Sequence, residues 1–167
     1  MRPMDAKIQK LATAGVLTAA VLVLTLVSVP YGLGYLHAGD AAVLLTGTLL
    51  GGGWGCACAV LGSALADIVL GYTVYIPATV IAKAAASLLA ALLTRKMPVR
   101  WSMTALVIAA FPVWICYFLY EWPMFGIGVA VGNLAGNFLQ SIVGALLAYI
   151  LTRVTRKIRA SHRGDTE

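Results

Sequence analysis

The side chains most suited to binding a small molecule are amides and carboxylates placed in or beside apolar segments. Asn133, Asn137 and Gln140 recur at i, i+4 and i+7, which puts three amides on one helix face. Asp40 and Glu121 border other apolar runs. Amides and carboxylates near aromatic rings suit a flat heterocycle with several hydrogen-bond donors and acceptors. The alternative is that the amides only join neighbouring helices.

Polar residues at membrane depth are costly and therefore count as functional candidates. The candidate binding residues are predicted at one end of the molecule. They are His37, Asp40, Tyr72, Tyr75, Lys83, Tyr120, Glu121, Asn133, Asn137 and Gln140.

Asp67 and Lys83 are predicted at comparable depths on consecutive antiparallel helices. An ion pair between them would offset the desolvation cost of each group and lock the two helices together. The alternative leaves Lys83 free to meet an anionic group on a ligand.

Several kinds of chemistry are not expected. His37 and His162 are the only histidines and are predicted at opposite ends, which excludes a His-based catalytic pair. The chain has no Gly-x-x-x-x-Gly-Lys-Ser/Thr motif, so we expect no nucleotide hydrolysis by this chain. Cys56, Cys58 and Cys116 form no CxxC pair and are interpreted as packing residues. We therefore expect neither an enzyme nor a cofactor or metal.

The elements that position these residues are predicted to be membrane-spanning helices. The chain is 61% apolar and only 11% charged. Since one span takes about 20 apolar residues, there is room for roughly six. The predicted spans are 8–29, 40–50, 54–70, 76–94, 103–120 and 127–152, the second being short, followed by a basic tail at 153–167. The sequence thus predicts a single-domain, all-α integral membrane protein (1–167), its first span retained rather than cleaved as a signal peptide.

Charge predicts the orientation of this bundle. All but one of the 12 Lys and Arg residues fall in three clusters, from Arg2 to Lys10, from Arg95 to Arg100 and from Arg153 to Arg163. Basic loops stay in the cytoplasm, so both termini and the middle loop are predicted inside and the candidate binding residues toward the outside. The net charge of +6 is interpreted as orienting the chain and contacting anionic lipid, not nucleic acid.

Five stretches carry a resemblance to a known family. They are His37-Ala38-Gly39-Asp40, the run from Gly62 to Asp67, Gly71-Tyr72-x-x-Tyr75-x-Pro77-x-Thr79-x-x-x-Lys83, the run from Tyr117 to Glu121, and the run from Gly132 to Gln140. Their order resembles that of the substrate-capture subunits (S components) of energy-coupling factor (ECF) vitamin transporters. The resemblance extends from Lys10 to Thr152.

The resemblance implies a prokaryotic plasma-membrane protein that captures a B-type vitamin or precursor from outside. It also implies docking on a transmembrane coupling subunit driven by two cytoplasmic ATPases. The family's small-residue docking patch corresponds here to Gly15-x-x-x-Ala19, and the loop from Tyr31 to Leu36 would cover the pocket.

The residues leave the solute open. Thiamin-like, pyrimidine, pyridoxine-like and flavin ligands are all compatible, and the two carboxylates Asp40 and Glu121 favour a neutral or cationic, donor-rich ring. Two other functions are considered: a scaffold without ligand, and a small channel. A channel would need polar residues that continue to the cytoplasmic side, and residues 141–150 contain few.

Overall fold

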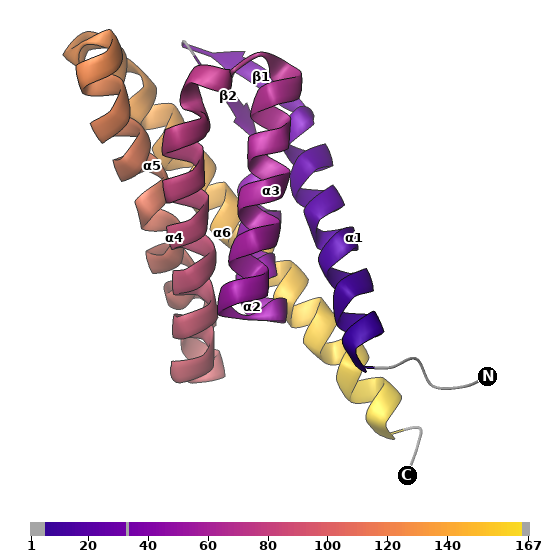
Figure 1. Cartoon of the computed structure of the whole chain (residues 1–167). Helices are drawn as coiled ribbons and strands as arrows, with labels where there is room; N and C mark the ends of the chain where they lie inside the picture. Colours follow the sequence, from indigo (N-terminus) through magenta and orange to yellow (C-terminus); the bar gives the residue numbers. More distant parts are fainter. Residues whose placement is uncertain (1–5, 33, 165–167) are drawn as a thin grey trace.

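The computed structural model describes residues 6–32 and 34–164 of the 167-residue chain. Within them lie six α-helices and one β-hairpin (Figure 1). The helices are α1 (Ala6–Leu26), α2 (Gly39–Leu50), α3 (Gly52–Leu70), α4 (Ile76–Lys96), α5 (Ser102–Phe125) and α6 (Ile127–Gly164); the strands are β1 (Ser28–Tyr31) and β2 (Gly34–His37). The predicted fold class, six helices with a short second one, is confirmed. Arg2 of the first basic cluster and Leu33 of the predicted covering loop lie outside the described residues.

Five of these helices are long and apolar enough to cross a membrane, and α2 is the shorter exception. Its 12 residues rise about 18 Å, less than the roughly 30 Å of a hydrocarbon core. Residues 39–47 of α2 are all buried, and α2 packs against α1, α3, α4 and α6. The short helix therefore lies inside the bundle, shielded by longer helices.

The first helix ends earlier than predicted. Residues 27–29 were expected to complete a span reaching residue 29, but α1 stops at Leu26 and Ser28 begins β1. In the antiparallel hairpin Ser28 pairs with His37 and Tyr31 with Gly34, and Gly32 at the turn has a φ of 58°. Pairing with β2 gives the backbone of this segment its hydrogen-bond partners once the helix has ended.

Two other boundaries differ because single glycines make the turns. Gly51 and Gly126 have φ angles of 85° and 89°, which favour glycine, and each alone separates two helices. The gap predicted at 51–53, between the second and third spans, therefore shrinks to Gly51. The predicted loop at 121–126 shrinks to Gly126, since α5 continues through Pro123 to Phe125. Glu121 consequently sits on a helix.

The last helix is also longer than predicted. Helix α6 continues to Gly164 instead of ending at residue 152, so the basic segment after that residue is helical in the part that the structure describes.

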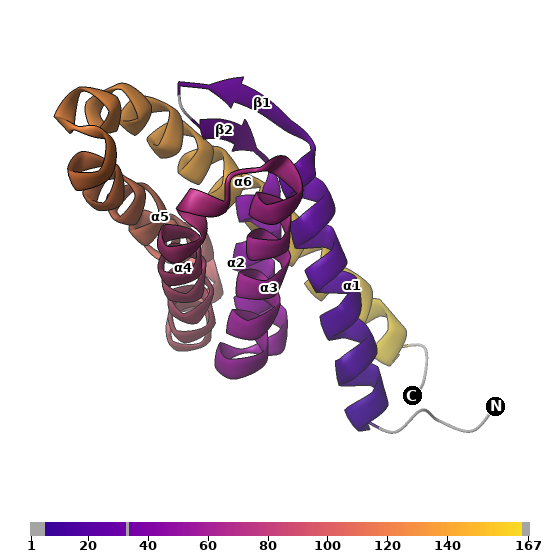
Figure 2. The ribbon, with the colours of Figure 1, turned by 45° about the horizontal axis from the view of Figure 1, so that its top comes forward.

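The bundle has two chemically different ends (Figure 1). At the end here called the basic end lie the first turn of α1, the last turns of α6, the α2–α3 turn and the connection from α4 to α5 (Figure 1), near which the sequence places Arg95, Lys96 and Arg100. At the opposite end, here called the hairpin end, lie the β-hairpin, the α3–α4 link and the α5–α6 turn. Figure 2 shows the hairpin lying across this end between α1 and α6.

Small residues let α2 and α4 approach closely. A Cβ on Gly47 would collide with the backbone oxygen of Ser87, and the hydroxyl groups of Thr46 and Ser87 are 3.0 Å apart. Ala82, Ala86 and Ala90 on α4 are fully buried. This close contact in the bundle holds the polar side chains of α2 and α4 in register with one another.

Candidate functional site

A polar pocket lies beneath the hairpin. It contains about 370 Å³ of empty space, including the part open to solvent. Side chains from the hairpin, from α3, from the link between α3 and α4, and from α5 and α6 line it: Tyr35, His37, Asp67, Tyr75, Tyr117, Glu121, Asn137 and Gln140.

The hairpin forms the cover of the pocket. The Tyr35 hydroxyl donates to Asp67 Oδ1 at 2.5 Å, and the backbone N–H of His37 donates to Gln140 Oε1 at 2.9 Å. The His37 ring is fixed in turn because its Nδ1 accepts the N–H of Gly39 at 2.9 Å. Side-chain bonds to α3 and α6 thus tie β2 down at two points.

Burial sets the protonation of the two hairpin groups. It raises the pKa of Tyr35 well above 10, with the hydrogen bond to Asp67 acting in the same direction. Burial also lowers the pKa of His37 to about 4, although nearby Asp40 opposes this. At neutral pH the Tyr35 hydroxyl is therefore a donor and the imidazole of His37 carries no charge.

A closed ionic network lies next to this cover. Lys83 Nζ donates to Asp40 Oδ1 at 2.5 Å, and Gln140 Nε2 donates to Asp40 Oδ2 at 2.9 Å. Asp40 and Lys83 are each only 1% exposed. Both carboxylate oxygens of Asp40 are thus occupied, and the charge of Lys83 is neutralised.

The expected Asp67–Lys83 ion pair is therefore wrong. Lys83 pairs with Asp40 because the close contact of α2 and α4 brings that carboxylate to the ammonium, while Asp67 accepts the Tyr35 hydroxyl. The alternative in which Lys83 is free for a ligand is also not what the structure shows.

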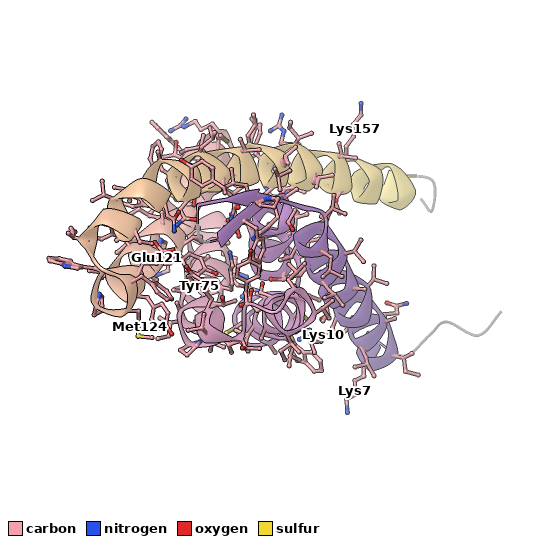
Figure 3. All side chains as sticks on the ribbon, turned by 90° about the horizontal axis from the view of Figure 1, so that it is seen from above. Lys7, Lys10, Tyr75, Glu121, Met124 and Lys157 are labelled. Atoms are coloured by element: carbon pink, nitrogen blue, oxygen red, sulfur yellow. The ribbon has the colours of Figure 1, made fainter. Side chains whose placement is uncertain are left out.

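Glu121 forms the opposite wall. Its Oε1 accepts Asn133 Nδ2 at 2.9 Å and the Tyr75 hydroxyl at 3.3 Å. Figure 3 shows Tyr75 and Glu121 close together within the bundle, whereas Lys7 and Lys157 point away from it. The i, i+4 relation of Tyr117 and Glu121 on α5 directs both side chains to the pocket.

Aromatic rings line this wall and continue toward the hairpin. The ring of Tyr75 lies 6.2 Å from that of Tyr117 and 6.2 Å from that of Tyr72. Tyr72 is in turn 4.8 Å from Tyr35. The pocket thus has flat faces that suit stacking on a planar ligand.

Two carboxylate oxygens remain without a hydrogen-bond partner. They are Asp67 Oδ2 and Glu121 Oε2, and each belongs to a side chain only 2% exposed. An unsatisfied buried carboxylate oxygen is costly, so each of these two atoms would be stabilised by a further hydrogen-bond donor.

The structure separates the predicted binding residues into three groups. His37, Tyr75, Glu121, Asn137 and Gln140 line the pocket. Asp40, Lys83 and Asn133 bond to other side chains of the site, and Tyr72 contacts the ring of Tyr35. Tyr120 points elsewhere, donating to the backbone oxygen of Val74 at 2.5 Å.

Sequence reasoning missed three lining residues as binding residues: Tyr35, Asp67 and Tyr117. The spacing of Tyr117 four residues before Glu121 could have identified it. Nothing local could have identified Tyr35, because the hairpin carries it over the pocket.

Other features concern partners and metals. Gly15 and Ala19 lie with Trp54 and Leu61 along an apolar groove between α1 and α3. Among the residues that the structure describes, no three His, Cys, Asp or Glu side chains are grouped so that they could hold a metal ion.

A bundle of membrane-spanning helices with a polar pocket under a hairpin is the architecture of a membrane protein that binds a small polar solute. The family comparison agrees: the sequence profile described as "ECF-type riboflavin transporter, S component" matches residues 5–157. The chain therefore belongs to the family of ECF-type riboflavin transporter S components and is a multi-pass membrane protein. The predicted resemblance is confirmed, and a family of transporter subunits agrees with the expectation of a non-catalytic protein.

A solved structure gives the same fold. The structure described as "Structure and mechanism of the S component of a bacterial ECF transporter" superposes with a TM-score of 0.76, covering 91% of this chain and 98% of that chain. The two sequences are 22% identical, so this likeness supports the architecture alone. No curated protein matches the chain.

Proposed function

We propose that this protein is the solute-capturing subunit of an ECF importer and binds a B-type vitamin or vitamin precursor in the pocket beneath the hairpin. Riboflavin is the first candidate by family. The observation that carries the proposal is the pocket itself, which combines aromatic faces with amide and carboxylate groups. A ligand-free scaffold would gain nothing from burying Asp67 and Glu121 with one oxygen of each unsatisfied.

The hairpin is proposed to act as a lid at the outer face of a prokaryotic cell membrane. The basic end faces the cytoplasm according to the distribution of Lys and Arg, so the pocket opens outward. The bonds of Tyr35 to Asp67 and of His37 to Gln140 hold the hairpin, and the Tyr31 hydroxyl adds a longer contact of 3.4 Å to Gly132. A cover held by few contacts can open without unfolding the helices.

The apolar groove at Gly15 and Ala19 is proposed as the contact with a transmembrane coupling subunit, which two ATPases drive from the cytoplasm. A side chain added at Gly15 would meet nothing within 4 Å, so this face of α1 is free to receive another helix. Gly15→Leu should abolish co-purification of the coupling subunit and leave solute binding intact. Val16→Leu, a change at a neighbouring exposed position, is the control.

The proposal is tested by purifying the protein and identifying any co-purifying small molecule by mass spectrometry. Affinity for a panel of vitamins and precursors is then measured with and without Glu121→Gln and Asn137→Ala. Leu139→Ala, on the exposed side of α6, is the matched control. Absence of any bound molecule, together with no capture of a coupling subunit, would contradict the proposal.

A further inference from the structure

The charge of the pocket narrows the class of solute. Asp67 comes from α3 and Glu121 from α5, and both line the same pocket. Each uses one oxygen for protein hydrogen bonds and leaves the other, Oδ2 or Oε2, without a partner. Both side chains are only 2% exposed, so a missing hydrogen bond at either oxygen is costly.

No protein cation balances these two carboxylates among the described residues that line the pocket. Lys83 is committed to Asp40 at 2.5 Å, and that pair is neutral as a unit. His37, the other basic group at the pocket, is uncharged at neutral pH because burial lowers its pKa to about 4. The ionised forms of Asp67 and Glu121 therefore have no counter-charge among the described residues of the pocket, and a bound cation is the group that would stabilise those forms most.

The remaining lining favours a planar ring. Tyr35, Tyr75 and Tyr117 contribute aromatic faces, which attract both a stacked ring and a cation. The same pocket, with about 370 Å³ of empty space including its open part, also presents amide and carboxyl groups beside these rings.

Resting on the function proposed above, we propose that the pocket selects a small nitrogen heterocycle bearing a cationic or amine N–H group, which donates to Asp67 Oδ2 or Glu121 Oε2, in preference to a neutral flavin. The carboxylates act as specificity-determining acceptors. Asn137 supplies a further polar contact at the wall.

The test is a matched pair of ligands on the unaltered protein. Pyridoxamine and pyridoxine share one ring and differ in an ammonium against a hydroxyl group, so their ratio of affinities reports the preference for charge. Isothermal titration calorimetry at pH 7 should show that pyridoxamine binds at least about tenfold more tightly than pyridoxine. Thiamin, a permanent cation, and riboflavin, a neutral tricycle, extend the comparison, and thiamin should bind more tightly.

Variants then assign the preference to the two carboxylates. Asp67→Asn and Glu121→Gln should each reduce the pyridoxamine-to-pyridoxine ratio several-fold. Ser63→Ala is the matched control, because Ser63 lies one turn before Asp67 on α3, is buried with an unpartnered hydroxyl, and does not line the pocket. It should leave the ratio unchanged.

The outcomes separate this inference from the proposed function. Tighter binding of riboflavin than of either cation would overturn the inference while supporting vitamin capture. A preference for pyridoxamine that both charge-removing variants leave intact would also overturn it. If no probe binds and no small molecule co-purifies, the proposed function fails as well. The ligand pair on the unaltered protein decides the matter even where a variant does not fold.

Discussion

Two groups of buried carboxylates lie within the same bundle but are bonded differently. Asp40 has both oxygens occupied, one by Lys83 and one by Gln140. Asp67 and Glu121 are just as deeply buried, yet each keeps one oxygen without a partner. Burial alone therefore does not distinguish a structural carboxylate from one available to a ligand. The difference lies in whether every oxygen has a donor within the protein.

Mutation of the closed network of Asp40, Lys83 and Gln140 should reduce the stability of the protein more than mutation at Asp67 or Glu121. Lys83→Met leaves Asp40 as a buried, uncompensated charge, so we expect a loss of about 3–5 kcal/mol in the free energy of unfolding. Thermal unfolding in detergent measures it. The double variant Lys83→Met with Asp40→Asn should recover part of the loss, since it also removes the orphaned charge. Unchanged stability in the single variant would show that the ion pair contributes little.

Among the described residues, the one hydrogen bond that the Asp67 carboxylate accepts comes from the hairpin. Tyr35→Phe removes the donor to Asp67 Oδ1 and leaves that carboxylate without either hydrogen bond. We expect a loss of about 2–3 kcal/mol, concentrated in opening of the hairpin. Hydrogen exchange of the amides in 28–37 should accelerate. Tyr31→Phe is the control, because the contact of the Tyr31 hydroxyl with the Gly132 backbone oxygen is exposed and, at 3.4 Å, longer than that of Tyr35 with Asp67.

The position of the closed network depends on how closely α2 approaches α4. Gly47→Ala places a methyl group against the backbone oxygen of Ser87 and forces the two helices apart. We expect about 2 kcal/mol of destabilisation in thermal unfolding. Gly53→Ala is the matched control, since a Cβ there meets nothing within 4 Å. An equal effect of the two substitutions would argue against the close contact.

The smallest expected effect concerns pH. Burial lowers the pKa of His37 to about 4, against an ordinary value of 6.5. Between these values the unfolded chain binds more protons, so stability falls as the pH drops below about 6.5, and the loss is complete below about 4. For this partly exposed ring we expect about 1 kcal/mol after solvent screening.

His37→Asn isolates that contribution, because an amide oxygen can still accept the Gly39 N–H. Melting temperatures at pH 7.5 and pH 4.5 should differ more in the unaltered protein than in the variant. A larger change of melting temperature with pH in the variant than in the unaltered protein would contradict the lowered pKa of His37.

Sequence patterns predicted the helical part of this protein well because those signals are local. Apolar length gave the order of six helices and identified the second as short. Helical spacing placed Asn137 and Gln140 on one face, and both line the pocket. The boundary at Glu121 was missed: the fifth span was predicted to end at residue 120, and α5 continues through Pro123 to Phe125.

The sequence by itself determined a membrane protein with one plain basic end and one end rich in polar and aromatic groups. Composition and spacing suffice for that, since they fix which segments leave water and which face each residue occupies. Tertiary structure alone decided that Lys83 pairs with Asp40, that the segment after α1 forms a hairpin, and that Tyr35 reaches Asp67. The two side-chain contacts join residues far apart in the chain, so they depend on which elements pack beside one another and at what distance.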